Sequence, residues 1–193
     1  MKARSAIAAL SFATAIGMLA GPSAAAPVQW SGNGNAYEVV VGTFSWEQAS
    51  IAAAGSVWMG VNGHLVTLTS SDENLFVSGL SPDLAGYAVG GLQGAGATTL
   101  SDGWQWVTGE AFAYTNWNAG EPNDEDGVEG GHENRLYLIA AANAHGNAWN
   151  DQSGNHSNGY IVEYEGIGAI PEPQTWALLL AGLGLLGFAA RRR

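Results

Sequence analysis

Two short runs in the second half of the chain carry the side chains best suited to chemistry, Glu121-Pro122-Asn123 and Trp149-Asn150-Asp151. Each run combines a carboxylate with an asparagine amide, and both groups offer hard oxygen donors. Six acidic residues lie between positions 121 and 133: Glu121, Asp124, Glu125, Asp126, Glu129 and Glu133. Charges this dense repel one another unless water or a cation neutralises them. Calcium accepts about six to eight oxygen ligands in irregular geometry, so this set favours a calcium site, with a solvated acidic loop as the alternative.

The charge distribution restricts the partners of the chain. All 17 acidic residues lie between Glu38 and Glu172, and Arg135 is the one basic residue of six in that interval. The resulting negative field repels nucleic acid and anionic lipid, which excludes nucleic acid as a partner and favours cations or neutral ligands. Because the sequence has no cysteine, disulfides, thiolate metal sites and cysteine nucleophiles are excluded. No serine nucleophile signature is present either, and we expect no enzymatic activity.

The N-terminal segment has the layout of a secretory signal peptide. Lys2 and Arg4 precede an apolar run over 6–20, and small residues follow at 23–26. We place the signal peptide at residues 1–25, with a permanent N-terminal anchor as the alternative. An exported protein is therefore expected.

The C-terminal segment combines Pro171-Glu172-Pro173, an apolar run over 175–190, and three arginines at 191–193. The apolar run falls just below the ~17–25 residues of a typical membrane-spanning helix, and snorkelling arginines can supply the difference. The positive-inside rule places these arginines in the cytoplasm and the preceding domain outside. We therefore expect an inner-membrane stage through this helix. Taken alone, the pattern also fits a permanent tail anchor.

Between these ends the pattern predicts an α+β domain. Ser45 and Gln48 have the spacing of a capping box for a helix ending at Gly55, and Ser70 and Glu73 repeat it for a helix through about Leu80. Short strands are predicted over 37–41, 65–68, 87–89, 104–106, 136–139 and 160–165. This order of elements favours α+β over parallel α/β architecture. Residues 116–134 carry almost no regular signal, and long loops of this kind are usually functional or disordered.

An ordered set of short motifs resembles the C-type lectin domain family. The motifs are Trp46-Glu-Gln-Ala49, Trp104-Gln-Trp106-Val-Thr-Gly109, Asn116-Trp117, Gly120-Glu121-Pro122-Asn123, Trp149-Asn150-Asp151 and Tyr160-Ile-Val-Glu163. The resemblance spans about residues 37–165 and implies a C-type lectin fold over 26–168, with two helices flanking small antiparallel sheets and a long calcium-binding loop region. Residues 169–193 resemble the bacterial PEP-CTERM sorting signal. That signal implies processing by a membrane protease, an exosortase, and a final place at the cell surface or outside the cell.

In sugar-binding members of this family, the Glu-Pro-Asn and Trp-Asn-Asp runs hold the principal calcium ion. Carried over, the resemblance implies five residues that bind both calcium and carbohydrate: Glu121, Asn123, Glu133, Asn150 and Asp151. Glu129 is the alternative to Glu133, because the loop over 124–132 is longer than in common members. Two vicinal sugar hydroxyls would bring the coordination to about eight. A cis Glu121–Pro122 peptide would let both flanking side chains face one ion.

The Glu-Pro-Asn order implies sugars of the mannose or glucose type, for example in an exopolysaccharide. The alternative is a structural or adhesive matrix protein whose calcium only stabilises the fold and whose surface binds protein. In the first case calcium is a cofactor for sugar binding, and in the second it is structural.

Several residues depart from the family pattern or support it. Arg135, Gly154, Val162 and an alanine near Ala53 stand at the customary cysteine positions, so both disulfides are absent. Asp102 and Asp124 are candidates for the remnants of a second calcium site.

We expect four tryptophans in the core and all four histidines at the surface. Those tryptophans are Trp104, Trp106, Trp117 and Trp149. Trp149 is expected to support Asn150 and Asp151 from beneath.

Overall fold

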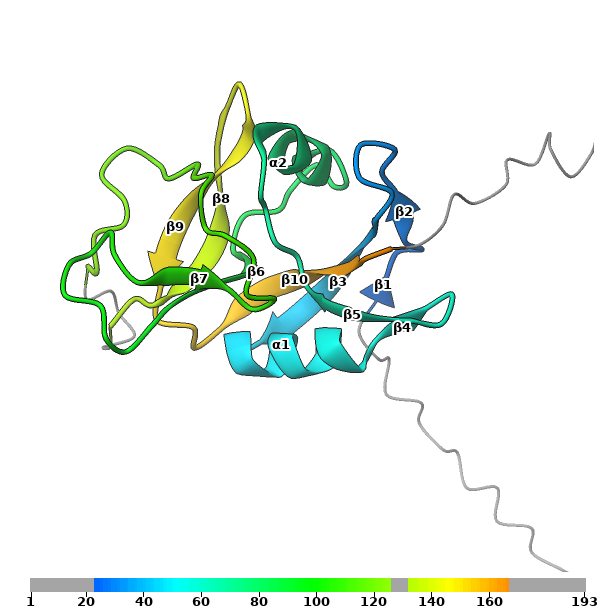
Figure 1. Ribbon diagram of the computed structural model, residues 1–193, viewed down its shortest axis with the longest axis horizontal. Helices are drawn as coiled ribbons and strands as arrows, with labels where there is room; N and C mark the ends of the chain where they lie inside the picture. Colours follow the sequence, from blue (N-terminus) through cyan, green and yellow to red (C-terminus); the bar gives the residue numbers. More distant parts are fainter. Residues whose placement is uncertain (1–22, 126–131, 167–193) are drawn as a thin grey trace, which may run out of the picture.

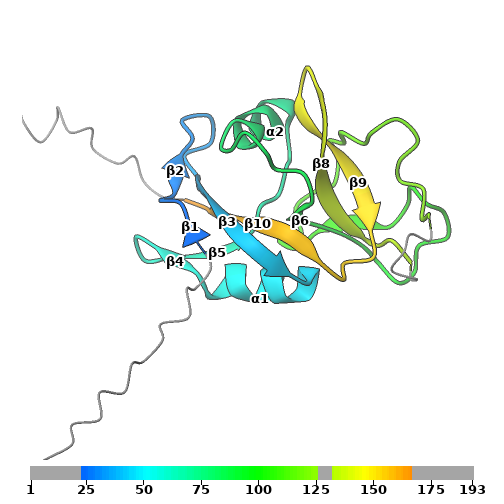
Figure 2. The same cartoon turned by 180° about the vertical axis from the view of Figure 1, so that it is seen from behind.

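The computed structural model describes residues 23–125 and 132–166, which form one mixed sheet with a helix on either side (Figures 1 and 2). The helices are α1 (Trp46–Gly55) and α2 (Ser71–Ser78). The strands are β1 (Ser23–Ala24), β2 (Val28–Gln29), β3 (Ala36–Phe44), β4 (Val57–Trp58), β5 (Val61–Leu65), β6 (Tyr87–Gln93), β7 (Trp104–Trp106), β8 (Arg135–Asn143), β9 (Gly146–Gln152) and β10 (Ser157–Tyr164). The predicted α+β class is confirmed.

Strand β10 organises the sheet. It pairs antiparallel with β3 and β5 and parallel with β6, and β8 and β9 continue the sheet beyond β6. The parallel pairing of β10 with β6 departs from the antiparallel sheets expected from the sequence. Gly159 permits it, because a Cβ there would lie 2.4 Å from both the Tyr87 ring and the Val40 carbonyl oxygen. A glycine is needed where these strands converge.

Helix α1 begins and ends where the sequence predicts. The Ser45 hydroxyl accepts a hydrogen bond from the Gln48 N–H at 3.1 Å, and the Gln48 side chain accepts from the Ser45 N–H at 2.9 Å, which completes the capping box. The helix buries Trp46, Ala49 and Ala53 and packs against β5 and β10. The apolar face of this helix therefore packs on the core.

Helix α2 has only half of its predicted capping box. The Ser70 hydroxyl accepts from the Glu73 N–H, but the Glu73 carboxylate turns inward and accepts from the Thr69 N–H and hydroxyl, each at 2.8 Å. Helix α2 packs against β9, the strand that carries the Trp149-Asn150-Asp151 run. The Glu73 side chain is therefore buried and does not complete the capping box at the start of α2.

The strand predicted over 65–68 is wrong in its position, because β5 ends at Leu65. Residues 66–68 stay buried and bridge strands irregularly: the Val66 N–H donates to Ile161 O at 2.9 Å. The Thr67 N–H donates to the Glu163 carboxylate at 3.0 Å instead of to a strand carbonyl. A buried side chain thus replaces a regular strand partner.

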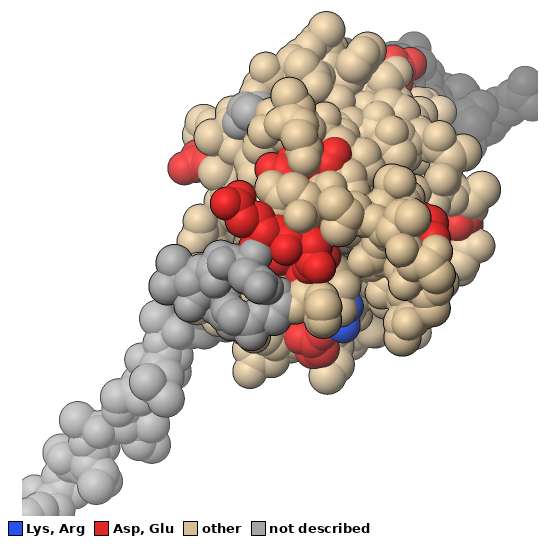
Figure 3. Space-filling view, turned by 90° about the vertical axis from the view of Figure 1, so that its left-hand side faces the viewer, with Lys and Arg blue, Asp and Glu red and all other residues tan. Residues whose placement is uncertain are grey.

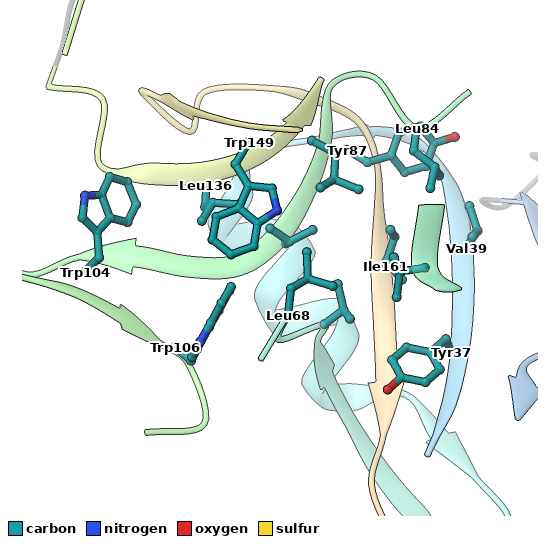
Figure 4. Packing of buried hydrophobic residues seen from close by; sticks show 14 residues of the cluster. Tyr37, Val39, Leu68, Leu84, Tyr87, Trp104, Trp106, Leu136, Trp149 and Ile161 are labelled. Atoms are coloured by element: carbon teal, nitrogen blue, oxygen red, sulfur yellow. The ribbon is translucent and has the colours of Figure 1, made fainter. Parts of the chain in front are cut away.

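The core beneath the candidate site is aromatic (Figure 4). Trp149 is fully buried, and Trp104 and Trp106 are buried beside it, as predicted. Trp117 is only partly buried, although its ring packs edge-on against Trp149 at 5.7 Å. This cluster provides a rigid floor under β9.

The predicted targeting segments lie almost entirely outside the described residues. Strand β1 overlaps the end of the predicted signal peptide and pairs with Val40 and Val41 of β3. No helix within 23–125 or 132–166 is long and apolar enough to cross a membrane. The predicted span over 175–190 is not among these residues.

Candidate functional site

The long loop is fastened to β9 at its start. Trp117 forms a parallel bridge with Trp149: the Trp149 N–H donates to Asn116 O, and the Asn118 N–H donates to Trp149 O, both at 2.9 Å. This bridge brings the Glu121-Pro122-Asn123 run to the strand that carries the second run, 26 residues or more away in sequence. The Glu121–Pro122 peptide is cis.

Asp151 connects the two runs directly. Its side chain is buried, with 1% of the residue exposed, and both carboxylate oxygens accept from the Asn123 N–H at 3.1 Å. One of these oxygens also accepts from the Asp124 N–H at 2.9 Å. Asp151 therefore anchors the loop through charge-assisted hydrogen bonds.

Glu121 and Glu133 lie within electrostatic range of Asp151. Burial raises the pKa of Glu121, and the neighbouring Asp151 carboxylate raises it further. Burial, followed by the charges of Asp151 and Glu121, raises the pKa of Glu133 to about 7. Oε2 of Glu121 is buried and has no hydrogen-bond donor among the described residues. Carboxylates with raised pKa values lack a compensating positive charge.

Asp124 shapes the loop. It adopts a positive φ of 46°, which aspartate tolerates better than most residues. Its carboxylate accepts from the Glu133 N–H at 2.6 Å and contacts Nδ1 of exposed His132 at 3.2 Å. The bond with His132, followed by that with the Glu133 N–H, lowers the pKa of Asp124. These contacts hold Glu133 close to Asn123.

The structure therefore gathers four of the five predicted residues, Glu121, Asn123, Glu133 and Asp151, at one end of the domain. Figure 3 shows acidic side chains concentrated on this face. Asn150 follows Trp149 on β9 and is partly exposed, but its side chain makes no hydrogen bond within the described part of the chain. Glu129, the alternative to Glu133, lies outside the described residues.

The fit to a calcium ion rests on the chemistry of these donors. Across the described ranges, no three His, Asp or Glu side chains form a group arranged to hold a metal as they stand. Asp151 instead uses both oxygens on loop N–H groups. The buried, donorless oxygen of Glu121 beside two further carboxylates nevertheless matches the hard, negatively charged donors that calcium prefers.

Sequence reasoning missed the loop-shaping role of Asp124 and a second buried acidic cluster. In that cluster, Glu73 and Glu163 are each 2% exposed and share the Tyr37 hydroxyl, which lies 2.7 Å and 3.1 Å from their Oε1 atoms. A capping glutamate and a strand glutamate give no sequence signal of mutual contact. A signal existed only for Glu163, which interrupts an apolar strand.

Two of the four positions that correspond to the family's cysteines, Arg135 and Gly154, are neighbours in the structure. A Cβ added to Gly154 would lie 2.8 Å from Cγ of Arg135. The Arg135 guanidinium stacks 4.8 Å from the Trp46 ring centre and pairs with Glu47 at 2.9 Å. Arg135 is therefore held by stacking on Trp46 and by an ion pair with Glu47.

Comparisons with known proteins agree with this geometry. The chain is 30% identical over 125 residues to perlucin from Haliotis laevigata, covering 64% of this chain and 76% of perlucin. It is 32% identical over 121 residues, 62% of this chain, to mouse C-type lectin domain family 4 member G, of which it spans only 37%. Among solved structures, the human scavenger receptor C-type lectin carbohydrate-recognition domain superposes with a TM-score of 0.57 at 20% identity, covering 72% of this chain and 96% of that one.

A separate match concerns the C-terminus, where residues 169–193 fit the PEP-CTERM protein-sorting motif. This motif marks exported proteins that are sorted to the surface. The relatives whose descriptions state a class are lectins, a class that is generally not enzymatic. Given the long match to perlucin, the shared architecture and the two motif runs, the chain belongs to the C-type lectin-like domain family and ends in a PEP-CTERM sorting motif.

Proposed function

We propose that this domain binds carbohydrate in a calcium-dependent manner, with mannose- or glucose-type hydroxyl pairs as the ligand class. The supporting observation is the buried, donorless carboxylate oxygen of Glu121 beside Asp151 and Glu133. Three carboxylates are costly to hold together in a partly buried site unless a cation is available to them. The lectin relatives supply the carbohydrate half of the proposal.

In this proposal Glu121, Asn123, Glu133, Asn150 and Asp151 hold the ion. The bound calcium supplies open coordination positions for two sugar hydroxyls. Each carboxylate near those positions accepts a hydrogen bond from a sugar hydroxyl, and each asparagine amide N–H donates a hydrogen bond to a hydroxyl oxygen. Asn150 is partly exposed at the end of β9, where it can reach a ligand without competing contacts within the described residues.

The sorting motif at the C-terminus indicates where this activity takes place. The sorting motif at 169–193 supports processing by an exosortase-type protease after an inner-membrane stage, with delivery to the surface or the extracellular matrix. An exopolysaccharide is the partner that fits this location and the negative charge of the domain, because its neutral hydroxyls are not repelled.

A calcium titration of residues 26–168 tests the proposal. Among the residues that the structure describes, all buried apolar side chains lie between Ala36 and Tyr164, so this segment contains them. We expect the wild-type segment to bind calcium, and Asp151→Asn to weaken binding by at least about tenfold because a neutral amide replaces a central carboxylate. Asp83→Asn is the matched control: Asp83 is exposed and its amide analogue keeps an oxygen for the Ala85 N–H.

Retention on mannose-agarose in calcium then tests sugar binding. Elution by both a chelator and free mannose supports the proposal. Elution by chelator alone favours the matrix-protein alternative, in which calcium is structural. Equal calcium affinity for wild type, Asp151→Asn and Asp83→Asn would exclude the site itself.

A further inference from the structure

The β4–β5 hairpin carries apolar side chains that the fold leaves exposed. Val57 is 60% exposed and Met59 is 62% exposed. Among the large apolar residues that the structure describes, only Ile51 (74%), on the helix that leads into the hairpin, is more exposed. Trp58 and Val61 pair across the hairpin and pack, partly buried, against the core. The core therefore holds the hairpin in place while Val57 and Met59 remain in solvent.

The turn at the tip of this hairpin carries a residue that its backbone disfavours. Because Trp58 pairs with Val61, the loop consists of Met59 and Gly60, and both have a positive φ, of 50° and 85°. A positive φ at both loop positions is the requirement of a type I′ turn, which favours Asn-Gly and is strained for a bulky side chain. The turn itself therefore gives no reason for an apolar residue at position 59.

The hairpin lies in an uncharged part of an otherwise acidic domain. Residues 48–71 contain no Asp, Glu, Lys or Arg, and no other stretch within 26–168 is uncharged over such a length. His64, at the base of the hairpin, pairs with the Glu165 carboxylate at 3.3 Å. An apolar tip without fixed charge avoids the repulsion that the rest of the domain exerts on a negatively charged surface.

The chain leaves the domain beside this hairpin. Tyr164 of β10 pairs with Gly63 of β5, and the described residues end shortly afterwards, at Gly166. Because β10 and β5 are antiparallel, β10 runs toward the end of the domain from which the hairpin projects. Figures 1 and 2 show the hairpin at one end of the domain and β7, β9 and the long loop at the other. The candidate calcium site and the hairpin therefore lie at opposite ends.

The sequence beyond Gly166 supplies an apolar segment within reach of the hairpin. Residues 169–193 match the sorting motif, and their apolar run begins at Thr175. Residues 167–174 span at most about 30 Å even when fully extended. When the apolar run lies in a bilayer, this tether keeps the hairpin within about one bilayer thickness of the lipid surface. Such tethering raises the effective concentration of a weak contact.

We infer that the tip of the β4–β5 hairpin, Val57 and Met59, docks into the outer surface of the inner membrane while the C-terminal segment still tethers the domain. The inference rests on the inner-membrane stage proposed above and adds a second contact to it. The partner is the boundary between headgroups and acyl chains, which accepts exposed apolar side chains. Docking there directs the candidate calcium site away from the lipid. Cutting the tether releases the domain, because so small an apolar tip binds weakly alone.

Lipid-nitroxide quenching of a single introduced cysteine, labelled with a fluorophore, tests the docking, because the chain has no cysteine of its own. Asn62→Cys places the label on exposed Asn62, opposite Val57, and Ala119→Cys places it on the exposed long loop at the other end. In phosphatidylcholine vesicles, we expect residues 26–193 to show at least about threefold stronger quenching at position 62 than at position 119. Residues 26–168 should show no such difference.

Met59→Asn separates docking from folding. Asparagine suits the positive φ of the turn, so the melting temperature should stay equal or rise. Quenching at position 62 should nevertheless fall at least about threefold, because a polar side chain replaces an apolar contact with lipid. Met59→Leu should keep the quenching of wild type. Leu75→Asn is the matched control and should also leave it unchanged, since Leu75 is similarly exposed (52%) but lies on α2.

A label at Leu183→Cys, within the apolar run, reports on the membrane stage itself. If position 183 is quenched but position 62 is quenched no more than position 119, or if Met59→Asn changes nothing, the hairpin does not dock while the membrane stage stands. If position 183 is not quenched, the membrane stage fails and the inference fails with it. If residues 26–168 form a dimer that Met59→Asn dissociates, a second copy covers the hairpin and membrane docking is overturned.

Discussion

At the scale of single residues, the buried carboxylate pair below β10 has the clearest consequence for stability. Glu163 accepts from the Asn35 amide at 2.8 Å and from the Thr67 N–H at 3.0 Å, and it lies across the Tyr37 hydroxyl from Glu73. Burial raises its pKa from 4.5 to about 7, and the Glu73 charge adds to the rise. The folded domain therefore favours a protonated Glu163.

The pH dependence of stability follows from this pKa. Between about pH 4.5 and pH 7 the folded state holds a proton that the unfolded state has lost, so the free energy of unfolding falls as pH rises through this window and then levels off. Glu163→Gln is neutral throughout. We expect chemical denaturation in chelator to show the variant gaining stability relative to wild type between pH 5 and pH 8.

The other titratable groups around Glu163 are His64, Glu110, Glu73 and Tyr37. Glu133 contributes a slope of the same sign, since its pKa is also near 7, and this slope persists in the variant. Exposed Asp83→Asn serves as the control and should keep the wild-type slope. A constant difference between wild type and Glu163→Gln across this pH range would mean that Glu163 is charged in the folded state.

Residue identity alone predicted the candidate site better than it predicted this pair. Glu121, Asn123 and Asp151 are recognisable because a proline and a tryptophan mark their runs, and the structure brings them together. Glu163 alternates with Val162 and Tyr164 along β10, which predicts an outward position. Its burial arises because β10 is covered on both faces, a fact of tertiary packing that strand periodicity does not contain.

At the scale of elements, α2 supports β9 through a buried amide. Oδ1 of Asn74 accepts from the Trp149 indole N–H at 2.8 Å, and its Nδ2 donates to Asn147 O at 3.1 Å. Asn74 is 1% exposed, so the buried indole N–H of Trp149 would lose its partner without it, whereas Asn147 O would keep its hydrogen bond from the Asn116 amide at 2.9 Å. Helix α2 therefore holds the indole that lies next to the Asn150-Asp151 pair.

Asn74→Ala is expected to destabilise the domain by about 1–3 kcal/mol, because it leaves the buried indole N–H of Trp149 without its partner. Calcium affinity should fall as well, by about threefold or more, because Trp149 can shift beneath Asp151. Thermal melts and calcium titrations measure the two effects. Leu75→Ala, one position along α2 and exposed, should change neither. Lost stability with unchanged calcium affinity would show that α2 supports the fold but not the site.

Elements with local signals were predicted well, and elements defined by distant partners were not. The capping box at Ser45 sets α1 by contacts within four residues. The order of strands around β10, the parallel pairing with β6 and the irregular course of 66–68 depend on partners about 70 to 130 residues away. The sequence motifs indicated the fold by resemblance. The register of the strand pairing depends on how the sheet packs, and the motifs do not specify it.

At the scale of the whole molecule, the excess of negative charge is the main destabilising contribution that the described contacts leave uncompensated. Within residues 26–168 the sequence has sixteen acidic residues and one arginine, and that arginine is already engaged by Glu47 and Trp46. Such an excess destabilises a compact state by self-repulsion. Because the sequence has no cysteine, the long loop depends on packing, on Asp151 and, in our proposal, on calcium.

Two additions should therefore stabilise this domain to different extents. Sodium chloride screens all of the charges, with a Debye length falling from about 10 Å at 0.1 M to about 3 Å at 1 M, and should raise the melting temperature of wild type and Asp151→Asn alike by a few degrees. Calcium at about 100 times its Kd should stabilise wild type by a further ~2.7 kcal/mol, because it binds only the folded state.

Magnesium at the same concentration provides equal screening but fits such a site poorly, since it demands regular octahedral geometry. The decisive comparison is the calcium-minus-magnesium difference in melting temperature, which should be present in wild type and absent in Asp151→Asn. An equal response of wild type to both ions would mean that divalent cations act on this domain through its net charge and not through the carboxylates gathered around Asp151.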